Sequence, residues 1–192
     1  NFELLKYSSK YFYDHQNEIM CNNRIELVNY DPDGNIPDLS PSSIETFIKY
    51  INREQIRLTN ENISTLNYLA HKYEIDELIR STERYIERHP EACLSILTIH
   101  QNDGQISTGI YETIIARNLN DYINNEEMLD LQVPTIYRIL AKNTNEINLN
   151  EKIEKNNFLL KTLDKYGREA SALFEFADLD DQENDFFEIL LD

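Results

Sequence analysis

The sequence contains little glycine, cysteine or positive charge, and each shortage excludes a class of function. Four glycines among 192 residues leave little material for the glycine-rich loops that cradle phosphate groups. Eighteen basic residues stand against 35 acidic ones, and the formal net charge of −17 disfavours binding to nucleic acids or anionic membranes. The two cysteines, Cys21 and Cys93, show no disulfide-framework spacing, which indicates a reducing compartment.

Long apolar runs and targeting segments are also missing from the sequence. No stretch approaches the ~20 consecutive apolar residues that a membrane-spanning helix needs, and no signal peptide is present. We therefore expect a cytoplasmic protein, with the nucleus as the alternative location. The chain begins with Asn1 rather than methionine, so we expect it to be a fragment of a longer protein.

No residue arrangement typical of a catalytic or metal site occurs. The histidines, which are His15, His71, His89 and His100, do not pair with either cysteine at a metal-ligand spacing. Motifs of serine hydrolases and zinc proteases are lacking. The acidic stretch from Asp178 fails as a calcium loop because Glu183 stands where glycine is required. We predict no enzyme activity, no metal ion and no cofactor, and we interpret His71 and Cys93 as structural residues.

The stretch from residue 44 to residue 86 predicts three helices with short connections. The expected buried face of the first is Ile44, Phe47, Ile48 and Ile51, after a cap at Ser40 and a first-turn Pro41. The expected buried face of the second helix is Ile63, Leu66, Leu69, Ala70 and Tyr73, and Thr59 is expected to cap this helix. The third helix is expected to begin at Asp76 or Glu77, and its buried side is Ile75, Leu78, Ile79, Thr82 and Ile86. Ile56 and Leu58 alternate around Arg57 as in a short strand.

The same stretch resembles the second half of a BTB (POZ) domain. In that family a helix ending in an aromatic–Ile pair leads to a short strand, an LT-x-EN helix start and an L-A-x-K-Y turn into the last helix. The matching residues are Phe47, Tyr50, Ile51, Leu58, Thr59, Glu61, Asn62, Leu66, Leu69, Ala70, Lys72, Tyr73, Ile75 and Leu78. The chain departs from the family where Asn52, Arg53 and Glu54 replace the usual Tyr-Thr-Gly.

Within residues 2–18, the run Ser-Ser-Lys-Tyr-Phe resembles the S-P-x-F end of the first long helix of that domain, with Lys10 in place of the usual proline. Residues 24–30 alternate in polarity and are interpreted as the following strand. On this alignment the N-terminal strands of the family precede Asn1, so part of its usual dimer interface is missing. We predict a BTB/POZ domain lacking those strands over residues 1–89, within a mainly α fold that has a small β component.

Pro90 marks the predicted start of a second, all-α module. Residues 114–140 resemble the core of a BACK domain, the helical module that follows BTB domains. The matching residues are Ile115, Asn118, Leu119, Glu126, Met128, Leu129, Leu131, Ile139 and Leu140. Pro134 is expected in the first turn of a helix whose inward residues are Ile136, Ile139 and Leu140. We predict a BACK-like module over residues 90–192, with the resemblance weakest after residue 141 and a helix that ends at Gly167.

The resemblance implies protein binding rather than chemistry. BTB–BACK adaptors self-associate and recruit a cullin-type ubiquitin ligase, and a domain beyond the C-terminus binds the substrate protein. The implied cullin-binding residues are Tyr13, Glu18, Ile19, Met20, Tyr73, Glu74 and Glu77, and those implied in homodimer formation are Phe2, Leu4, Leu5, Tyr7 and Tyr11. For Tyr73, a core aromatic that closes the helical turn is the alternative role.

A self-associating scaffold with no ligase role is the alternative function. Cullin-binding members often carry an apolar residue two places before a glutamate just after the first helix. Here Gln16 precedes Glu18 at that position, which favours the scaffold. Neither hypothesis includes a nucleic-acid or membrane partner.

Overall fold

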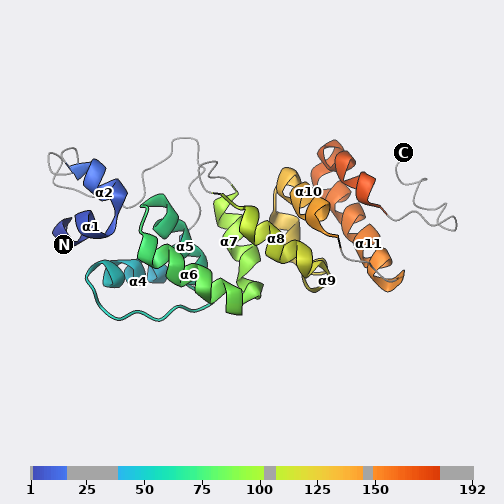
Figure 1. The fold of residues 1–192 in the computed structure, drawn as a ribbon. Coiled ribbons are helices and arrows are strands. Elements are labelled where there is room, and N and C mark those ends of the chain that lie inside the picture. The colour runs from blue at the N-terminus through green and yellow to red at the C-terminus, as the bar shows by residue number, and fades with distance from the viewer. Residues whose placement is uncertain (1, 17–38, 102–106, 145–148, 178–192) are drawn as a thin grey trace. The chain divides into compact units, whose positions relative to one another are not determined.

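The computed structural model describes residues 2–16, 39–101, 107–144 and 149–177, and the side chains of these residues from Leu5 onward. Contacts between residues divide the chain into two compact units, Asn1–Ile114 and Ile115–Asp192. All regular secondary structure in the described residues is helical, which confirms the mainly α prediction (Figure 1). The strand predicted at Ile56 and Leu58 is not formed, because residues 54–59 belong to no helix or strand. The strand predicted at residues 24–30 lies outside the described residues.

The first unit is built around one buried helix. Its elements are α1 (Phe2–Ser8), α2 (Lys10–Asp14), α4 (Pro41–Ile51), α5 (Ile63–Lys72), α6 (Asp76–Arg88), η1 (Pro90–Ala92), α7 (Cys93–His100) and the start of α8 (Gly109–Arg117). Every side chain of α5 from Ile63 to Ala70 is buried. Helices α4, α6 and α7 all pack against α5, as Figure 1 shows for α4 and α6. The predicted inward face of α5 is therefore confirmed, and burial extends around the helix.

Helix α4 has its predicted bounds but a different buried face. Pro41 occupies the first turn, while the Ser40 hydroxyl lies 2.9 Å from the Ser42 hydroxyl and caps no backbone N–H. Ser43 and Phe47 are buried, whereas Ile48 is 42% exposed. The prediction for Ile48 was wrong because the helix turns Ser43 inward, where its hydroxyl donates to the carbonyl oxygen of Glu61.

The turn before α5 uses Thr59 and Asn62 together. The carbonyl oxygen of Thr59 accepts backbone hydrogen bonds from Asn62 and Ile63, at 3.1 and 2.9 Å. The Asn62 side chain returns a bond, because its Oδ1 accepts from the Thr59 N–H at 3.0 Å. Its Nδ2 donates to the Arg57 carbonyl oxygen at 3.0 Å. This reciprocal arrangement satisfies backbone groups that a helix start otherwise leaves unpaired.

A buried polar network joins α5, α6 and α8. The Tyr111 hydroxyl donates to Asn67 Oδ1 at 3.0 Å, and Asn67 Nδ2 donates to Thr82 Oγ1 at 2.9 Å. The ring of His100 is fully buried beside it, edge-on to Tyr111 and to His71. Neither ring nitrogen of His100 has a hydrogen-bond partner among the described residues. Burial lowers the pKa of His100 to about 3, and proximity to His71 contributes.

The second unit contains the rest of α8 and five further elements in its described part. These are α9 (Leu119–Tyr122), η2 (Glu126–Asp130), α10 (Val133–Lys142), α11 (Leu149–Tyr166) and η3 (Gly167–Phe176). The predicted inward residues of α10, which are Ile136, Ile139 and Leu140, are buried. Helix α11 ends at Tyr166, and the next residue, Gly167, has a φ of +57°, the left-handed conformation predicted for a glycine after a helix.

The contact division and the predicted module boundary fall at different places. Helix α7 follows the predicted boundary at residues 89 and 90, yet it packs on α5 and belongs to the first unit. Cys93 and Leu94 lie fully buried there, which confirms the structural role expected for Cys93. The boundary between modules at residue 90 stays a prediction.

Candidate partner-binding surface

Tyr73 is the residue through which α2, α4 and α5 meet. Its ring stacks on Phe12 at 4.9 Å and on Phe47 at 6.0 Å between centroids, and lies edge-on to Tyr11 at 5.4 Å. The side chain is 2% exposed, and burial raises the pKa of Tyr73, with smaller contributions from Tyr11 and Tyr68. The side chain is thus part of the core rather than of the surface, which is the alternative that the sequence left open.

Ser9 attaches α2 to this aromatic cluster. Its side-chain oxygen accepts a hydrogen bond from the backbone N–H of Phe12 at 3.2 Å, which caps α2. Its hydroxyl donates to the backbone carbonyl oxygen of Tyr73. Ser9 is buried, so both bonds are shielded from water. The short helix α2 therefore has a defined position on the C-terminal end of α5.

In the turn between α5 and α6, a surface residue adopts the left-handed backbone conformation. The N–H of Glu74 bonds to the carbonyl of His71 at 3.1 Å, and the N–H of Ile75 bonds to that of Ala70 at 2.8 Å. This is the pattern of a Schellman motif, in which the left-handed position normally holds glycine. Here Glu74 takes it, with a φ of +49°, while Ile75 is buried. The carboxylate of Glu74 is thereby held on the exposed side of the turn.

Helix α4 ends in the same way. The N–H of Arg53 bonds to the carbonyl of Tyr50 at 2.9 Å, and that of Glu54 bonds to Lys49 at 3.0 Å. Arg53 has a φ of +61° and an exposed side chain. The departure from the family's Tyr-Thr-Gly thus coincides with a left-handed turn made without glycine.

An open groove of about 600 Å³ lies beside the Glu74 turn, and we call it the α2–α6 groove. It is lined by Lys6, Tyr7, Ser8, Ser9, Lys10 and Tyr13 from the N-terminal segment, and by His71, Glu74, Asp76 and Ile79 from α5 and α6. Tyr7 is 81% exposed and Tyr13 is 59% exposed. Exposed tyrosines offer apolar area with a polar end, a combination enriched at protein interfaces. One wall carries lysines and the other carries acidic residues.

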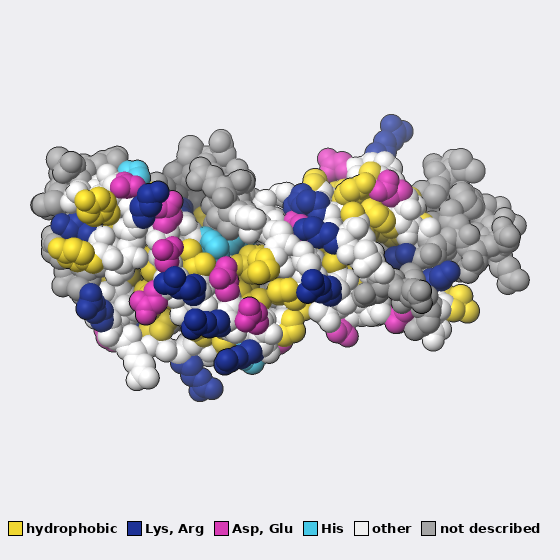
Figure 2. Space-filling model, in the orientation of Figure 1, with side chains coloured by type: hydrophobic (Ala, Val, Ile, Leu, Met, Phe, Trp, Pro, Cys, Tyr) yellow, Lys and Arg dark blue, Asp and Glu magenta, His cyan; other side chains and the backbone are white. Residues whose placement is uncertain are grey.

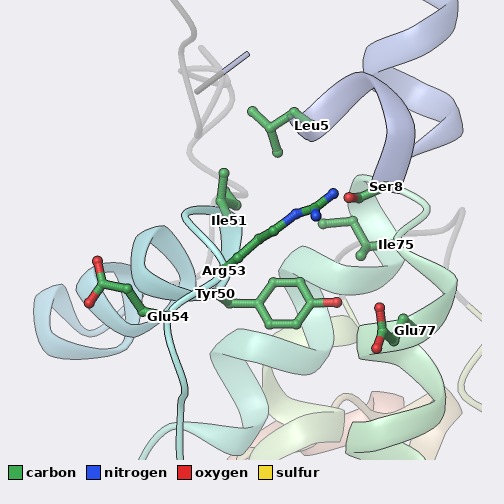
Figure 3. Close-up of a pocket in the computed structure, with 8 residues that line it drawn as sticks. All are labelled: Leu5, Ser8, Tyr50, Ile51, Arg53, Glu54, Ile75 and Glu77. Atoms are coloured by element: carbon green, nitrogen blue, oxygen red, sulfur yellow. The ribbon is translucent and has the colours of Figure 1, made fainter. Parts of the chain in front are cut away.

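A second pocket of about 420 Å³ shares Ser8 with the groove. Its lining residues are Leu5, Ser8, Tyr50, Ile51, Arg53, Glu54, Ile75 and Glu77. Figure 3 shows the Arg53 side chain reaching toward Ser8 and the Tyr50 hydroxyl pointing toward Glu77. Partial burial, and then the nearby Glu77 carboxylate, raise the pKa of Tyr50. The polar groups of this pocket come from three segments that are distant in sequence.

The structure brings together some of the predicted site residues and separates others. Tyr13 and Glu74 line the α2–α6 groove, and Glu77 lines the second pocket. In the predicted self-association set, Tyr7 is exposed, Tyr11 is half-buried and Leu5 belongs to the core. Outside the described residues or side chains lie Phe2, Leu4, Glu18, Ile19 and Met20.

Several lining residues escaped the sequence analysis. Asp76 and Ile79 were placed on a helix but not at a site, and Lys6, Lys10 and Arg53 were not considered as site residues. The sequence feature that pointed to these residues was the BTB/POZ resemblance. It implies that residues on either side of the predicted turn at Tyr73 lie close together. Which of their side chains share a cavity depends on how α2 packs, which periodicity does not determine.

The described residues contain no group of three or more His, Cys, Asp or Glu side chains arranged to hold a metal ion. No helix in the described part is long and apolar enough to cross a bilayer. The α2–α6 groove offers shape, aromatic area and charge, which are the means of binding another protein.

Comparison with known proteins identifies the region that carries this surface. Residues 4–90 match the family model of the BTB/POZ domain. The family model thus supports a BTB/POZ domain at residues 4–90. The chain is also similar to BTB/POZ domain-containing protein 6-A of Danio rerio, at 24% identity over 132 residues. The alignment covers 67% of this chain and 24% of that relative, so the chain spans about a quarter of the relative's length. No solved structure matches the chain.

The match confirms the BTB/POZ resemblance read from the sequence. It includes most of α1 and the whole of α2, α4, α5 and α6, and hence both walls of the α2–α6 groove. A BTB/POZ domain indicates a protein–protein interaction role, and the groove is an exposed, chemically mixed surface within that domain.

Proposed function

We propose that the protein is an adaptor whose BTB/POZ domain recruits a cullin-type ubiquitin ligase through the α2–α6 groove. The BTB/POZ domain forms a homodimer, and residues 90–192 act as a BACK-like module that separates it from a substrate-binding domain. The observation that carries this proposal is the groove, which exposes Tyr7 and Tyr13 next to the Glu74 turn. Cytoplasmic or nuclear location follows from the same role.

The composition of the groove supports binding to a helix of a partner protein. Tyr13 and Ile79 supply apolar contact, while Lys10 and Asp76 supply charges of opposite sign on facing walls. A partner residue that enters the groove can bury apolar area against Tyr13 and Ile79 and can pair with either Lys10 or Asp76. Tyr13 is the expected anchor, because tyrosine carries much of the energy at many protein interfaces.

Isothermal titration calorimetry of this chain with the N-terminal half of a cullin tests this proposal. We expect micromolar or tighter binding with one cullin per BTB/POZ domain. The Tyr13→Ala variant should bind at least tenfold more weakly, since loss of an interface anchor costs about 2 kcal/mol or more. No heat of binding at high protein concentration would refute the cullin role.

A self-associating scaffold is the second candidate. The observation that favours it is Gln16, which replaces the apolar residue that cullin-binding members often carry two positions before the glutamate. Sedimentation equilibrium of this chain distinguishes the two functions when combined with the titration. A homodimer that binds no cullin supports the scaffold, and a homodimer that binds cullin supports the adaptor.

A further inference from the structure

The outer face of α6 carries a row of three arginines. Arg80, Arg84 and Arg88 are spaced four residues apart on the same helix. Residues at this spacing follow one another along one side of a helix, and all three side chains are exposed. They lie opposite the buried face formed by Leu78, Thr82 and Ile86. Figure 2 shows Lys and Arg side chains in a row over this part of the first unit.

The arginines of this row have no partners within the described part of the chain. None of the three forms an ion pair or hydrogen bond with a described residue. Glu83 and Glu87 flank the row on one side of the helix, and Glu77 precedes it by one turn on the same side, but none of these carboxylates forms an ion pair with the row. The guanidinium groups are therefore available to carboxylates from another molecule.

The spacing of the row matches that of an extended peptide. Four residues of α-helix rise about 6 Å, so successive arginines are separated by that distance along α6. In an extended chain, every second residue points to the same side, and such residues lie about 6.6–6.8 Å apart. Guanidinium groups bind carboxylates through two parallel hydrogen bonds. Acidic residues at alternate positions can thus meet consecutive arginines in register.

We propose that the row Arg80, Arg84 and Arg88 binds an extended acidic segment of a partner protein, with carboxylates at alternate residues. The net charge of −17 repels an acidic segment from most of the surface. Charges beyond about 8 Å are screened at physiological ionic strength, so the row acts locally. The site is distinct from the α2–α6 groove, to which α6 contributes Asp76 and Ile79.

Fluorescence anisotropy with two labelled peptides tests the proposal. The first peptide contains Asp-Gln-Glu-Asn-Asp, with acids at alternate positions, and the second contains the same residues as Asp-Glu-Asp-Gln-Asn. At an ionic strength of about 0.15 M, where distant charges are screened, we expect the alternating peptide to bind at least threefold more tightly than its isomer. Each Arg→Gln change should weaken binding about two- to fivefold, the usual range for an exposed ion pair.

The triple variant R80Q/R84Q/R88Q should bind more than tenfold more weakly, while Lys161→Gln on the exposed side of α11 should not change binding. A triple Arg→Lys variant keeps the charge but loses two-point contact with a carboxylate. Its affinity for the peptide should therefore lie between that of the original chain and that of the triple glutamine variant. It also serves if the glutamine variant fails to fold by circular dichroism. Absence of binding, equal binding of the two peptides, or undiminished binding by the arginine variants would overturn the proposal.

Discussion

The Ser9 hydroxyl donates a hydrogen bond to the backbone carbonyl oxygen of Tyr73, a residue 64 positions later in the chain. The Oγ atom of Ser9 also accepts a hydrogen bond from the N–H of Phe12 and so caps α2. One buried side chain therefore begins a helix and attaches it to the end of α5. Since Tyr13 follows within α2, this bond also determines where one wall of the α2–α6 groove lies.

Replacing Ser9 with alanine should lower the free energy of unfolding by about 1–2 kcal/mol. The change removes a helix cap and leaves the buried carbonyl oxygen of Tyr73 without this donor. Urea denaturation followed by circular dichroism measures the effect. The matched control is Ser171→Ala at an exposed position of η3, which should change stability by less than about 0.5 kcal/mol. Equal effects of the two changes would contradict the role given to Ser9.

Replacing Glu74 with glycine should stabilise the protein by about 0.5–1 kcal/mol. Glu74 has a φ of +49°, a conformation that costs a residue with a Cβ atom about 1–2 kcal/mol. Glycine adopts it freely, although the greater freedom of glycine in the unfolded chain offsets part of the gain. Thermal and urea denaturation measure the change.

Glu87→Gly is the control for the glycine substitution. Glu87 is exposed near the C-terminal end of α6 and lies within the helix. Glycine there should destabilise by about 1 kcal/mol, because helix interiors favour residues other than glycine. The same substitution thus raises the free energy of unfolding at position 74 and lowers it at position 87. Destabilisation at both positions would show that Glu74 is not under backbone strain.

Acid should weaken the fold through His100. Its pKa in the folded protein is lowered to about 3 from an ordinary 6.5, by burial and by His71. The unfolded chain therefore binds the proton more readily than the folded one between these values. Stability is fully present above pH 6.5 and is lost as the pH falls toward 3. Between pH 7.5 and pH 5, we expect His100 to account for a loss of about 2 kcal/mol.

The variant His100→Phe isolates this effect. Phenylalanine keeps an aromatic ring beside Tyr68, His71 and Tyr111 but cannot bind a proton in this range. Urea denaturation at the two pH values should show a smaller difference for this variant than for the original chain. Tyr68→Phe serves as the packing control and should keep the full difference. A pH dependence unchanged by His100→Phe would contradict the assignment.

The helices of the first unit could be predicted because their apolar residues repeat at helical spacing. The buried faces of α5 and α6 were found in this way, and Leu66, Leu78 and Ile86 are indeed fully buried. The face of α4 was misplaced because Ser43 is polar, and the repeat of Ile44 and Ile48 appeared the better choice. Only the hydrogen bond from Ser43 to Glu61 makes its burial favourable, and that bond depends on tertiary structure.

The candidate site was only partly predictable. The resemblance located the turn after Tyr73, but it could not show whether that side chain faces the core or a partner. Three aromatic neighbours from two other helices decide this question, and they are distant in sequence. The left-handed conformations at Arg53 and Glu74 gave no signal, because sequence analysis expects glycine there.

The central claim is that the α2–α6 groove is the surface on which the BTB/POZ domain receives its partner. The most direct measurement compares the cullin dissociation constant of Glu74→Lys with that of Glu87→Lys. Both changes add the same charge to an exposed position, but only Glu74 lines the groove. We predict that Glu74→Lys weakens binding at least tenfold and that Glu87→Lys leaves it within twofold. Equal dissociation constants for the two variants would contradict the account.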